Sequence, residues 1–149
     1  MDKRAEELNS YLVEIFNEIL KTEENVILKN CFSNLSLNEL HVIEAVLNAE
    51  KNNQCKASEI AATLRVTGGT LTTAVSILEK KGYLFRQKCE KDRRVVYIHT
   101  TDLGKKANEK HAQFHSDFVA DIIKVISAEE LGILLRALGS VNDFLKEKI

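Results

Sequence analysis

The chain has 149 residues, of which 44% are hydrophobic and 29% charged, with a net charge of −1 and no proline. This length fits one domain with a core of its own, and the composition excludes a disordered chain. No apolar run reaches the ~18 residues that a membrane span needs, and the N-terminus MDKRAEEL lacks an apolar signal region. We therefore expect a cytoplasmic protein with no membrane partner.

Apolar residues near the N-terminus recur at helical spacing, which predicts a first helix from about Lys3 to Ile27. Ser36 and Glu39 form a capping box that opens a second helix, because the serine hydroxyl can bond the Glu39 amide while the carboxylate reaches back. The polar stretch 50–54 is predicted to be a loop. Residues 55–56 are predicted to form a brief strand that pairs with a later hairpin.

Two short helices are predicted next in the chain. The first covers Ser58 to Leu64, and a tight connection follows at residues 65–66. Thr67 is the predicted N-cap of the second, which ends near Lys81. Gly82 terminates this helix, at a position where a left-handed backbone is favoured.

A basic hairpin and two long helices complete the chain. The predicted strands cover residues 83–88 and 95–99, joined by the charged tip 90–94. Thr101 caps a long helix, and a second capping box at 127–130 opens the last helix. The residues that this last helix is predicted to bury are Leu131, Leu134, Leu135, Leu138, Val141 and Leu145.

The order of helix pair and hairpin indicates a winged helix-turn-helix, so the predicted fold class is mainly α with a small β-wing. Such a fold places one helix in the major groove of DNA and the hairpin beside it. Between Lys56 and His99 lie nine Lys or Arg and four Asp or Glu, a net charge of +5, which leaves −6 elsewhere. This segregation lets one surface meet phosphates. DNA binding is therefore the leading interpretation.

The helix over 67–81 carries a core face and an outer face rich in hydroxyl groups. Small hydroxyl residues can approach base edges or bond phosphates, and glycine lets the backbone come close to DNA. Arg93 and Arg94 at the tip can enter a minor groove or clamp phosphates, and Asp92 can orient an arginine through a bidentate pair. The predicted DNA-contacting residues are Ser58, Thr67, Gly69, Thr70, Thr72, Thr73, Ser76, Lys80, Lys91, Asp92, Arg93 and Arg94.

The run from Ser58 to Gly104 resembles the MarR family of winged-helix repressors. The likeness rests on SEIAATL, on LEKKGYL, on the tip DRR and on the Thr-x-x-Gly at 101–104. It implies one MarR-type domain over 1–149, with dimerisation helices at 1–30 and 105–149 and a winged helix at 36–100. It also implies a homodimer on a palindromic operator in double-stranded DNA, with Arg94 in the minor groove and Asp92 as its partner.

The surplus of apolar residues in the terminal helices independently favours a twofold dimer, since a small winged module could not cover them. The alternative is an ordinary helical core in a monomer.

A narrower resemblance is to fatty-acid biosynthesis repressors of the FabT type. It rests on Glu39-Leu-His41, on VTGGTLTT at 66–73, on DRRVV at 92–96 and on His111-x-x-Phe-His115. The resemblance implies repression of fatty-acid genes with long-chain acyl-acyl carrier protein as co-repressor. An apolar tunnel between the first and fifth helices would then receive the acyl chain. Gly68 and Lys56 depart from that pattern, so the operator cannot simply be copied.

His111 and His115 stand at i, i+4, a spacing that can bind metal on one helical face. No third ligand lies nearby in sequence, although His41 could approach in space. The favoured interpretation is a histidine that lines an interface or an effector pocket, with no metal and no cofactor. The predicted pocket residues are Phe16, His41, His111, Phe114, His115 and Phe118.

Other functions stay open at this point. The chain could be a generic MarR-type regulator that responds to a small aromatic or redox effector. The three cysteines, Cys31, Cys55 and Cys89, form no C-x-x-C, which argues against a zinc knuckle or a disulfide framework. A winged-helix module for protein contact is a further alternative. An enzyme is not expected, since the chain has no Gly-rich phosphate loop, no nucleophile elbow and no H-E-x-x-H.

Overall fold

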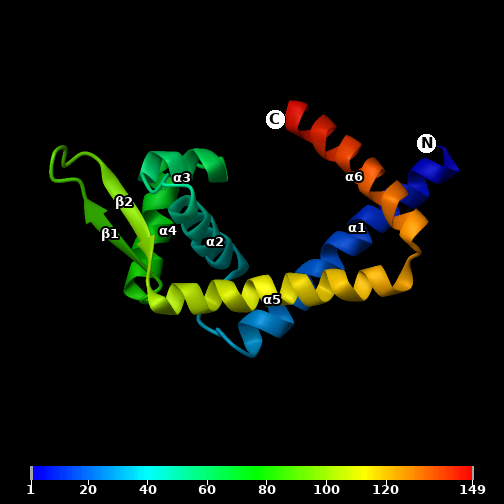
Figure 1. The fold of residues 1–149 in the computed structure, drawn as a ribbon, viewed down its shortest axis with the longest axis horizontal. Coiled ribbons are helices and arrows are strands. Elements are labelled where there is room, and N and C mark those ends of the chain that lie inside the picture. The colour runs from blue at the N-terminus through cyan, green and yellow to red at the C-terminus, as the bar shows by residue number, and fades with distance from the viewer. Residues whose placement is uncertain (1, 149) are drawn as a thin grey trace. The chain divides into compact units, whose positions relative to one another are not determined.

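The computed structural model describes residues 2–148, which form helices and one two-stranded sheet (Figure 1). Two compact units divide the chain, one ending at Phe114 and the other beginning at His115. No helix among the described residues is long and apolar enough to cross a membrane. In chain order the elements are α1 (Lys3–Glu23), the π-helix η1 (Glu24–Lys29), α2 (Leu37–Lys51), α3 (Ala57–Leu64), α4 (Gly68–Lys80), β1 (Leu84–Lys88), β2 (Val96–Thr100), α5 (Asp102–Val125) and α6 (Ala128–Lys148).

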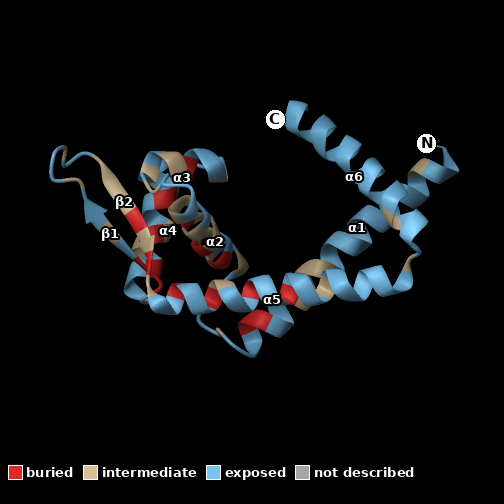
Figure 2. Cartoon of the chain, viewed as in Figure 1, coloured by how far each residue is buried: buried red, intermediate tan, exposed pale blue. Residues whose placement is uncertain are grey.

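The core of the first unit is built where the winged module packs on α2 and the start of α5 (Figure 2). On α4, Leu71, Val75 and Leu78 are buried at helical spacing, which fixes the opposite face of this helix toward solvent. The other fully enclosed apolar side chains include Ile27, Leu40, Ile43, Val46, Ile60, Leu84 and Ile98.

The sheet is an antiparallel hairpin, with β1 and β2 in register from Leu84 opposite Thr100 to Lys88 opposite Val96. Lys56 forms an isolated bridge with Tyr97, so the predicted brief strand at 55–56 is confirmed as a single bridge. This bridge connects the residue before α3 to the second strand of the wing.

The start of α5 is locked onto the end of the helix-turn-helix. Thr101 Oγ1 accepts from the Gly104 amide at 3.1 Å, which confirms the predicted cap, and donates to the Gly82 carbonyl at 2.6 Å. Gly82 has φ +87°, as its predicted left-handed position requires. A Cβ on Gly104 would lie 2.3 Å from the Tyr83 carbonyl oxygen, so only glycine fits there.

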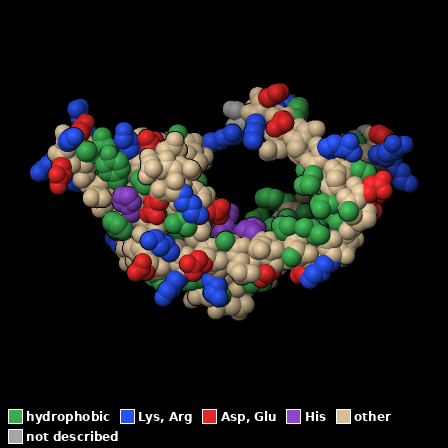
Figure 3. All heavy atoms as spheres, in the orientation of Figure 1, with side chains coloured by type: hydrophobic (Ala, Val, Ile, Leu, Met, Phe, Trp, Pro, Cys, Tyr) green, Lys and Arg blue, Asp and Glu red, His purple; other side chains and the backbone are tan. Residues whose placement is uncertain are grey.

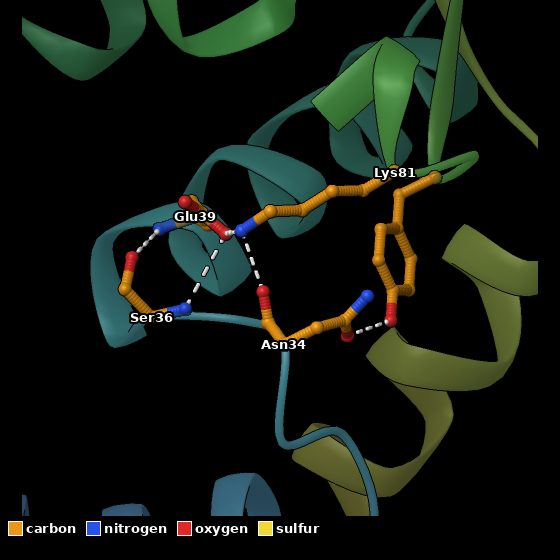
Figure 4. A network of polar contacts seen from close by, with 5 residues as sticks. Asn34, Ser36, Glu39 and Lys81 are labelled. Atoms are coloured by element: carbon orange, nitrogen blue, oxygen red, sulfur yellow. Dashed lines mark hydrogen bonds and ion pairs between the residues drawn. The ribbon is translucent and has the colours of Figure 1, made fainter. Parts of the chain in front are cut away.

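A polar network joins the C-terminal end of α4 to the N-terminal end of α2 (Figure 4). Lys81 Nζ donates to Glu39 Oε2 at 2.8 Å and to the Asn34 carbonyl, while Tyr83 Oη donates to Asn34 Oδ1 at 2.7 Å. The same Glu39 completes the predicted capping box with Ser36, which is confirmed. The Glu39 carboxylate is therefore shared between the N-terminus of α2 and the end of α4.

Several predicted boundaries shift for physical reasons. The first helix stops being α-helical at Glu23 and continues as η1, a wider turn that carries both Ile27 and Leu28 into the core. The predicted loop at 50–54 is wrong at its start, because α2 runs to Lys51. Glu50 stays helical while its carboxylate accepts from the Thr100 hydroxyl at 2.9 Å.

The short elements also move by one residue. Helix α3 begins at Ala57 instead of 58, since the Lys56 amide already bonds the Glu59 carboxylate at 3.4 Å. The strands begin one residue later than predicted. The Tyr83 amide bonds the Leu78 carbonyl and still belongs to the end of α4, while the Val95 amide bonds the Asp92 carbonyl within the tip.

The second unit contains the end of α5 and all of α6. Ser127 and Glu130 form the predicted capping box, with the Ser127 amide 2.7 Å from Glu130 Oε2. Hydrogen bonds from the Ser127 amide and hydroxyl lower the pKa of Glu130. The prediction that α6 buries its apolar residues is wrong for the single chain, because none of its described residues is buried. That apolar stripe is available to another surface.

Candidate nucleic-acid interface

The exposed face of α4 begins at Thr67, whose hydroxyl accepts from the Thr70 amide at 3.1 Å and so caps the helix as predicted. Gly68 and Gly69 follow in the first turn. A Cβ on either glycine would meet no atom within 4 Å, so packing within the chain does not require glycine at these positions. The first turn of α4 thus presents bare backbone to solvent.

The hydroxyl groups further along α4 bond back to their own helix. Thr73 Oγ1 donates to the Gly69 carbonyl at 3.1 Å, and Ser76 Oγ donates to the Thr72 carbonyl at 2.9 Å. Each hydroxyl oxygen keeps acceptor capacity. Thr72, Thr73 and Lys80 are exposed as predicted, but Ser76 is half-buried.

Ser76 is half-buried because Arg86 of β1 reaches across to α4. The guanidinium donates to Ser76 Oγ and to the Thr72 carbonyl, both at 2.9 Å, and to Glu79 Oε1 at 3.1 Å. The Arg86 amide also donates to Glu79 Oε2 at 3.0 Å. From the sequence, Arg86 contributed only to the positive net charge of this segment, with no predicted partner. The spacing of Thr72, Ser76 and Glu79 along one helical face is the signal that could have pointed to a partner.

The tip of the wing carries the predicted arginines. The Arg94 amide and Nε both donate to Asp92 Oδ1, at 3.0 and 3.3 Å. The predicted pairing of Asp92 with an arginine is thus present, although one oxygen takes both bonds and the contact is not bidentate. The Arg94 side chain is 93% exposed, and Arg93 and Lys91 are exposed beside it. Figure 3 shows Lys and Arg side chains around this hairpin.

A hollow of about 680 Å³ lies where α3, α4 and the wing meet. Predicted residues from three separate segments lie around it: Ser58 from α3, Thr72 and Ser76 from α4, and Arg94 from the wing. The tertiary structure therefore brings these four together on one surface, with Arg86 between them. Thr67, Gly69, Thr70 and Thr73 are not part of this lining.

A second polar cluster surrounds His111, which is 2% exposed. Its Nε2 contacts Glu23 Oε1 of α1, and its Nδ1 lies 2.9 Å from Glu44 Oε2 of α2. Burial by itself would lower the pKa of His111, but hydrogen bonds to Glu44 and Glu23 outweigh it and raise the pKa. The first and fifth helices therefore meet at a polar contact at this level.

The other predicted pocket residues are distributed unevenly. Phe114 is buried and Phe118 is half-buried on α5, whereas His115 is exposed. Phe16 of α1 is 63% exposed. His41 of α2 lies beside His111, with ring centroids 5.6 Å apart. Within the first unit, the structure thus joins His41 and His111 and leaves Phe16 on an open face.

A family model described as the MarR family matches residues 33–95. The transcriptional regulator AdcR of Streptococcus pneumoniae is 30% identical over 114 residues, which is 74% of each protein. The chain belongs to the MarR family.

Solved MarR-type structures agree with this assignment. The crystal structure of Streptococcus pneumoniae FabT in complex with DNA is similar to the chain at a TM-score of 0.89 and 34% identity, covering 97% of this chain and 99% of FabT. AbsC of Streptomyces coelicolor, a MarR family transcriptional regulator, shares the fold at a TM-score of 0.74 with 20% identity, covering 99% of this chain and 97% of AbsC. The predicted winged helix fold and the MarR and FabT-type resemblances are confirmed. MarR-family regulators are not enzymes, in agreement with the sequence.

Proposed function

We propose that the chain is a dimeric, sequence-specific DNA-binding regulator of transcription, which inserts α4 into the major groove and the wing into the adjacent minor groove. The observation that carries this proposal is the common surface of α4, α3 and the wing around Arg86 and Arg94. The FabT structure, determined in complex with DNA, supports it, since its similarity covers nearly the whole chain.

The first turn of α4 adds a physical reason. Glycine is a poorer helix former than alanine, so two exposed glycines in the first turn come at a cost to helix stability. Gly68 and Gly69 have no neighbour that would justify this cost within the chain. Close approach of a sugar-phosphate backbone justifies it, because the first-turn amides then reach phosphate oxygens directly.

Dimerisation is the second part of the proposal. Each compact unit has several exposed large apolar side chains on one helix, on α1 in the first unit and on α6 in the second. Contiguous exposed apolar faces on helices are normally buried in an interface. A twofold dimer would present two copies of α4 to half-sites one DNA turn apart, about 34 Å, which requires a palindromic operator.

Replacement of the wing arginine tests the DNA part directly. Arg94→Ala should weaken operator binding at least tenfold, about 1.4 kcal/mol, because a groove contact and a cation are both lost. Folding should be unchanged, since this side chain is 93% exposed. Arg136→Ala in α6 removes the same charge far along the chain and should bind normally. Equal affinity of the two variants would remove the wing from the model.

Selection from a random duplex pool tests sequence specificity. Enrichment of a palindrome supports a regulator, and Thr73→Ala should change the selected bases more than the total affinity. A pool that stays random, with weak binding, would instead identify a winged-helix module for protein contact.

The last part of the proposal concerns the identity of the effector. We propose that long-chain acyl-acyl carrier protein acts as co-repressor at fatty-acid genes, as the FabT-type motifs imply, and the 34% identity to FabT supports this. Fluorescence anisotropy with a labelled operator should show tighter binding when acylated carrier is added and no change with the unacylated carrier. Identical curves with both carriers would reject the fatty-acid role and leave a generic MarR-type regulator.

A further inference from the structure

Three helices of the first unit end in the same backbone motif. After α2, α3 and α4, one residue takes a left-handed conformation, at Asn53 (φ 53°), Arg65 (φ 55°) and Gly82 (φ 87°). In each motif the amide of this residue bonds the carbonyl three positions back, and the next amide bonds the carbonyl five positions back. This pair of bonds defines a Schellman motif, in which glycine is favoured and asparagine is tolerated at the left-handed position.

Arg65 is the exception among these three residues. At positive φ the Cβ of an arginine lies too close to a backbone carbonyl oxygen, a cost that glycine avoids and that asparagine offsets by local hydrogen bonding. Helix α3 would therefore end more favourably with glycine. We expect the strain to be offset by a contact of the arginine side chain.

Contacts within the chain do not supply that reason. Arg65 is exposed, and among residues 2–148 its side chain forms no hydrogen bond or ion pair. By contrast, Arg86 is bonded to α4 and Arg94 to Asp92. Arg65 thus carries a fixed cation with five N–H donors and no anionic partner in the described part of the chain.

The position of Arg65 places it beside the outer face of α4, in the turn that joins α3 to α4. Its neighbours Leu64 and Val66 line a second hollow of about 700 Å³, together with Thr70 and Thr73 of α4. Helical spacing puts this hollow and the one beside the wing on the two flanks of the outer face. Arg65 therefore lies on the flank of α4 that does not face the wing.

A helix in the major groove has a phosphate backbone on each of its two sides. On the wing side, Arg94 provides an exposed cation. The residues that line the second hollow include no lysine or arginine, and its Glu39 is already paired with Lys81 at 2.8 Å. Arg65 is placed to supply the positive charge on this second side.

We infer that Arg65 binds a DNA phosphate on the flank of α4 that does not face the wing, and that this contact offsets the strain of its left-handed backbone. This inference rests on the proposed function, because it requires α4 to occupy the major groove. It adds a contact that the predicted set of DNA-binding residues did not include.

Arg65→Gly separates the two effects of this residue. Glycine relieves the left-handed strain, so the urea midpoint of unfolding should rise, while loss of the cation should weaken duplex binding about tenfold in fluorescence anisotropy. Because a phosphate contact carries no sequence information, operator and random duplex should lose the same factor. In a dimer, the slope of log affinity against log salt should become shallower by roughly 2, since each chain loses one contact.

Arg65→Lys and Asn53→Gly are the matched controls. Lysine keeps both the cation and the left-handed backbone, so this variant should bind duplex within about threefold of the wild type and unfold at an unchanged midpoint. Asn53→Gly changes the same motif at the end of α2, outside the lining of both hollows, and should leave duplex affinity unchanged.

An Arg65→Gly variant with wild-type affinity and salt slope would overturn the inference. A loss confined to the operator would overturn it as well, by assigning Arg65 to a base edge, and a urea midpoint that does not rise would contradict the strain. Each of these outcomes can occur while Arg94→Ala still binds weakly. Failure here is therefore distinguishable from failure of the proposed function, in which the wild type itself binds no duplex.

Discussion

Arg86 and Glu79 are joined twice, because the amide and the guanidinium of Arg86 donate to different oxygens of one carboxylate, at 3.0 and 3.1 Å. One residue belongs to the first strand of the wing and the other to α4. The guanidinium continues to Ser76 and the Thr72 carbonyl on the same helix. The wing and α4 are thereby held in one relative orientation.

Arg86→Lys should loosen this orientation while keeping the charge. A lysine cannot reproduce the planar fork of donors, so we expect the ratio of operator to random-duplex affinity to fall about tenfold. Stability should fall by only about 1 kcal/mol, since both side chains are partly exposed. Thermal denaturation and anisotropy at several salt concentrations measure the two effects. Lys88→Ala, which removes an exposed cation of the same strand, should instead weaken binding to both duplexes equally.

Gly104 and Gly69 should respond to alanine in opposite ways. Gly104→Ala forces a Cβ to within 2.3 Å of the Tyr83 carbonyl, so we expect a loss of about 1–3 kcal/mol in unfolding free energy. Gly69→Ala enters open space in a helix and should stabilise the chain by roughly 0.5–1 kcal/mol. Urea denaturation distinguishes them. The stabilised Gly69→Ala should nevertheless bind operator more weakly, and undiminished binding would argue against close backbone approach.

Cys89 in the wing and Cys55, just before the Lys56 bridge, should differ in reactivity. Backbone hydrogen bonds at Asp92 and Lys91 lower the pKa of the Cys89 thiol, whereas burial and the nearby Glu50 and Glu59 raise that of Cys55. Because the thiolate is the reactive form, Cys89 should be alkylated faster near neutral pH, and the difference should shrink as the pH rises. Mass spectrometry of iodoacetamide-treated protein over a pH series measures both rates. Faster modification of Cys55 at neutral pH would contradict this assignment.

The exposed apolar face of α6 should be required for assembly. Leu135 is 62% exposed, so Leu135→Asp removes nothing from the core of the single chain but places a charge in the proposed interface. We expect sedimentation to show a dimer for the wild type and a monomer for this variant, with helical content retained. Glu147→Gln, near the polar end of α6, should remain a dimer. A wild-type monomer at working concentration would contradict the dimer proposal.

Local signals explain why much of the fold was predictable. Capping boxes at Ser36 and Ser127, the left-handed Gly82 and the apolar spacing of α4 each act within a few residues, so the chain reveals them directly. The first residue of each strand was harder to predict, because hydrogen bonds hold Tyr83 and Val95 in the turns that precede the strands. The burial predicted for α6 failed because helical periodicity shows which face is apolar, not what covers it.

By itself, the sequence determined the order of the elements, the winged helix and the residues of its outer face, since these follow from local periodicity, capping and charge. Only the tertiary structure decided that Arg86 hydrogen-bonds to α4 and that Gly104 packs against the Tyr83 backbone. It also decided that Glu23, His41 and His111 come together from three helices. Those relationships join residues that are far apart along the chain. Their distances are set by the packing of the whole unit, which no local pattern encodes.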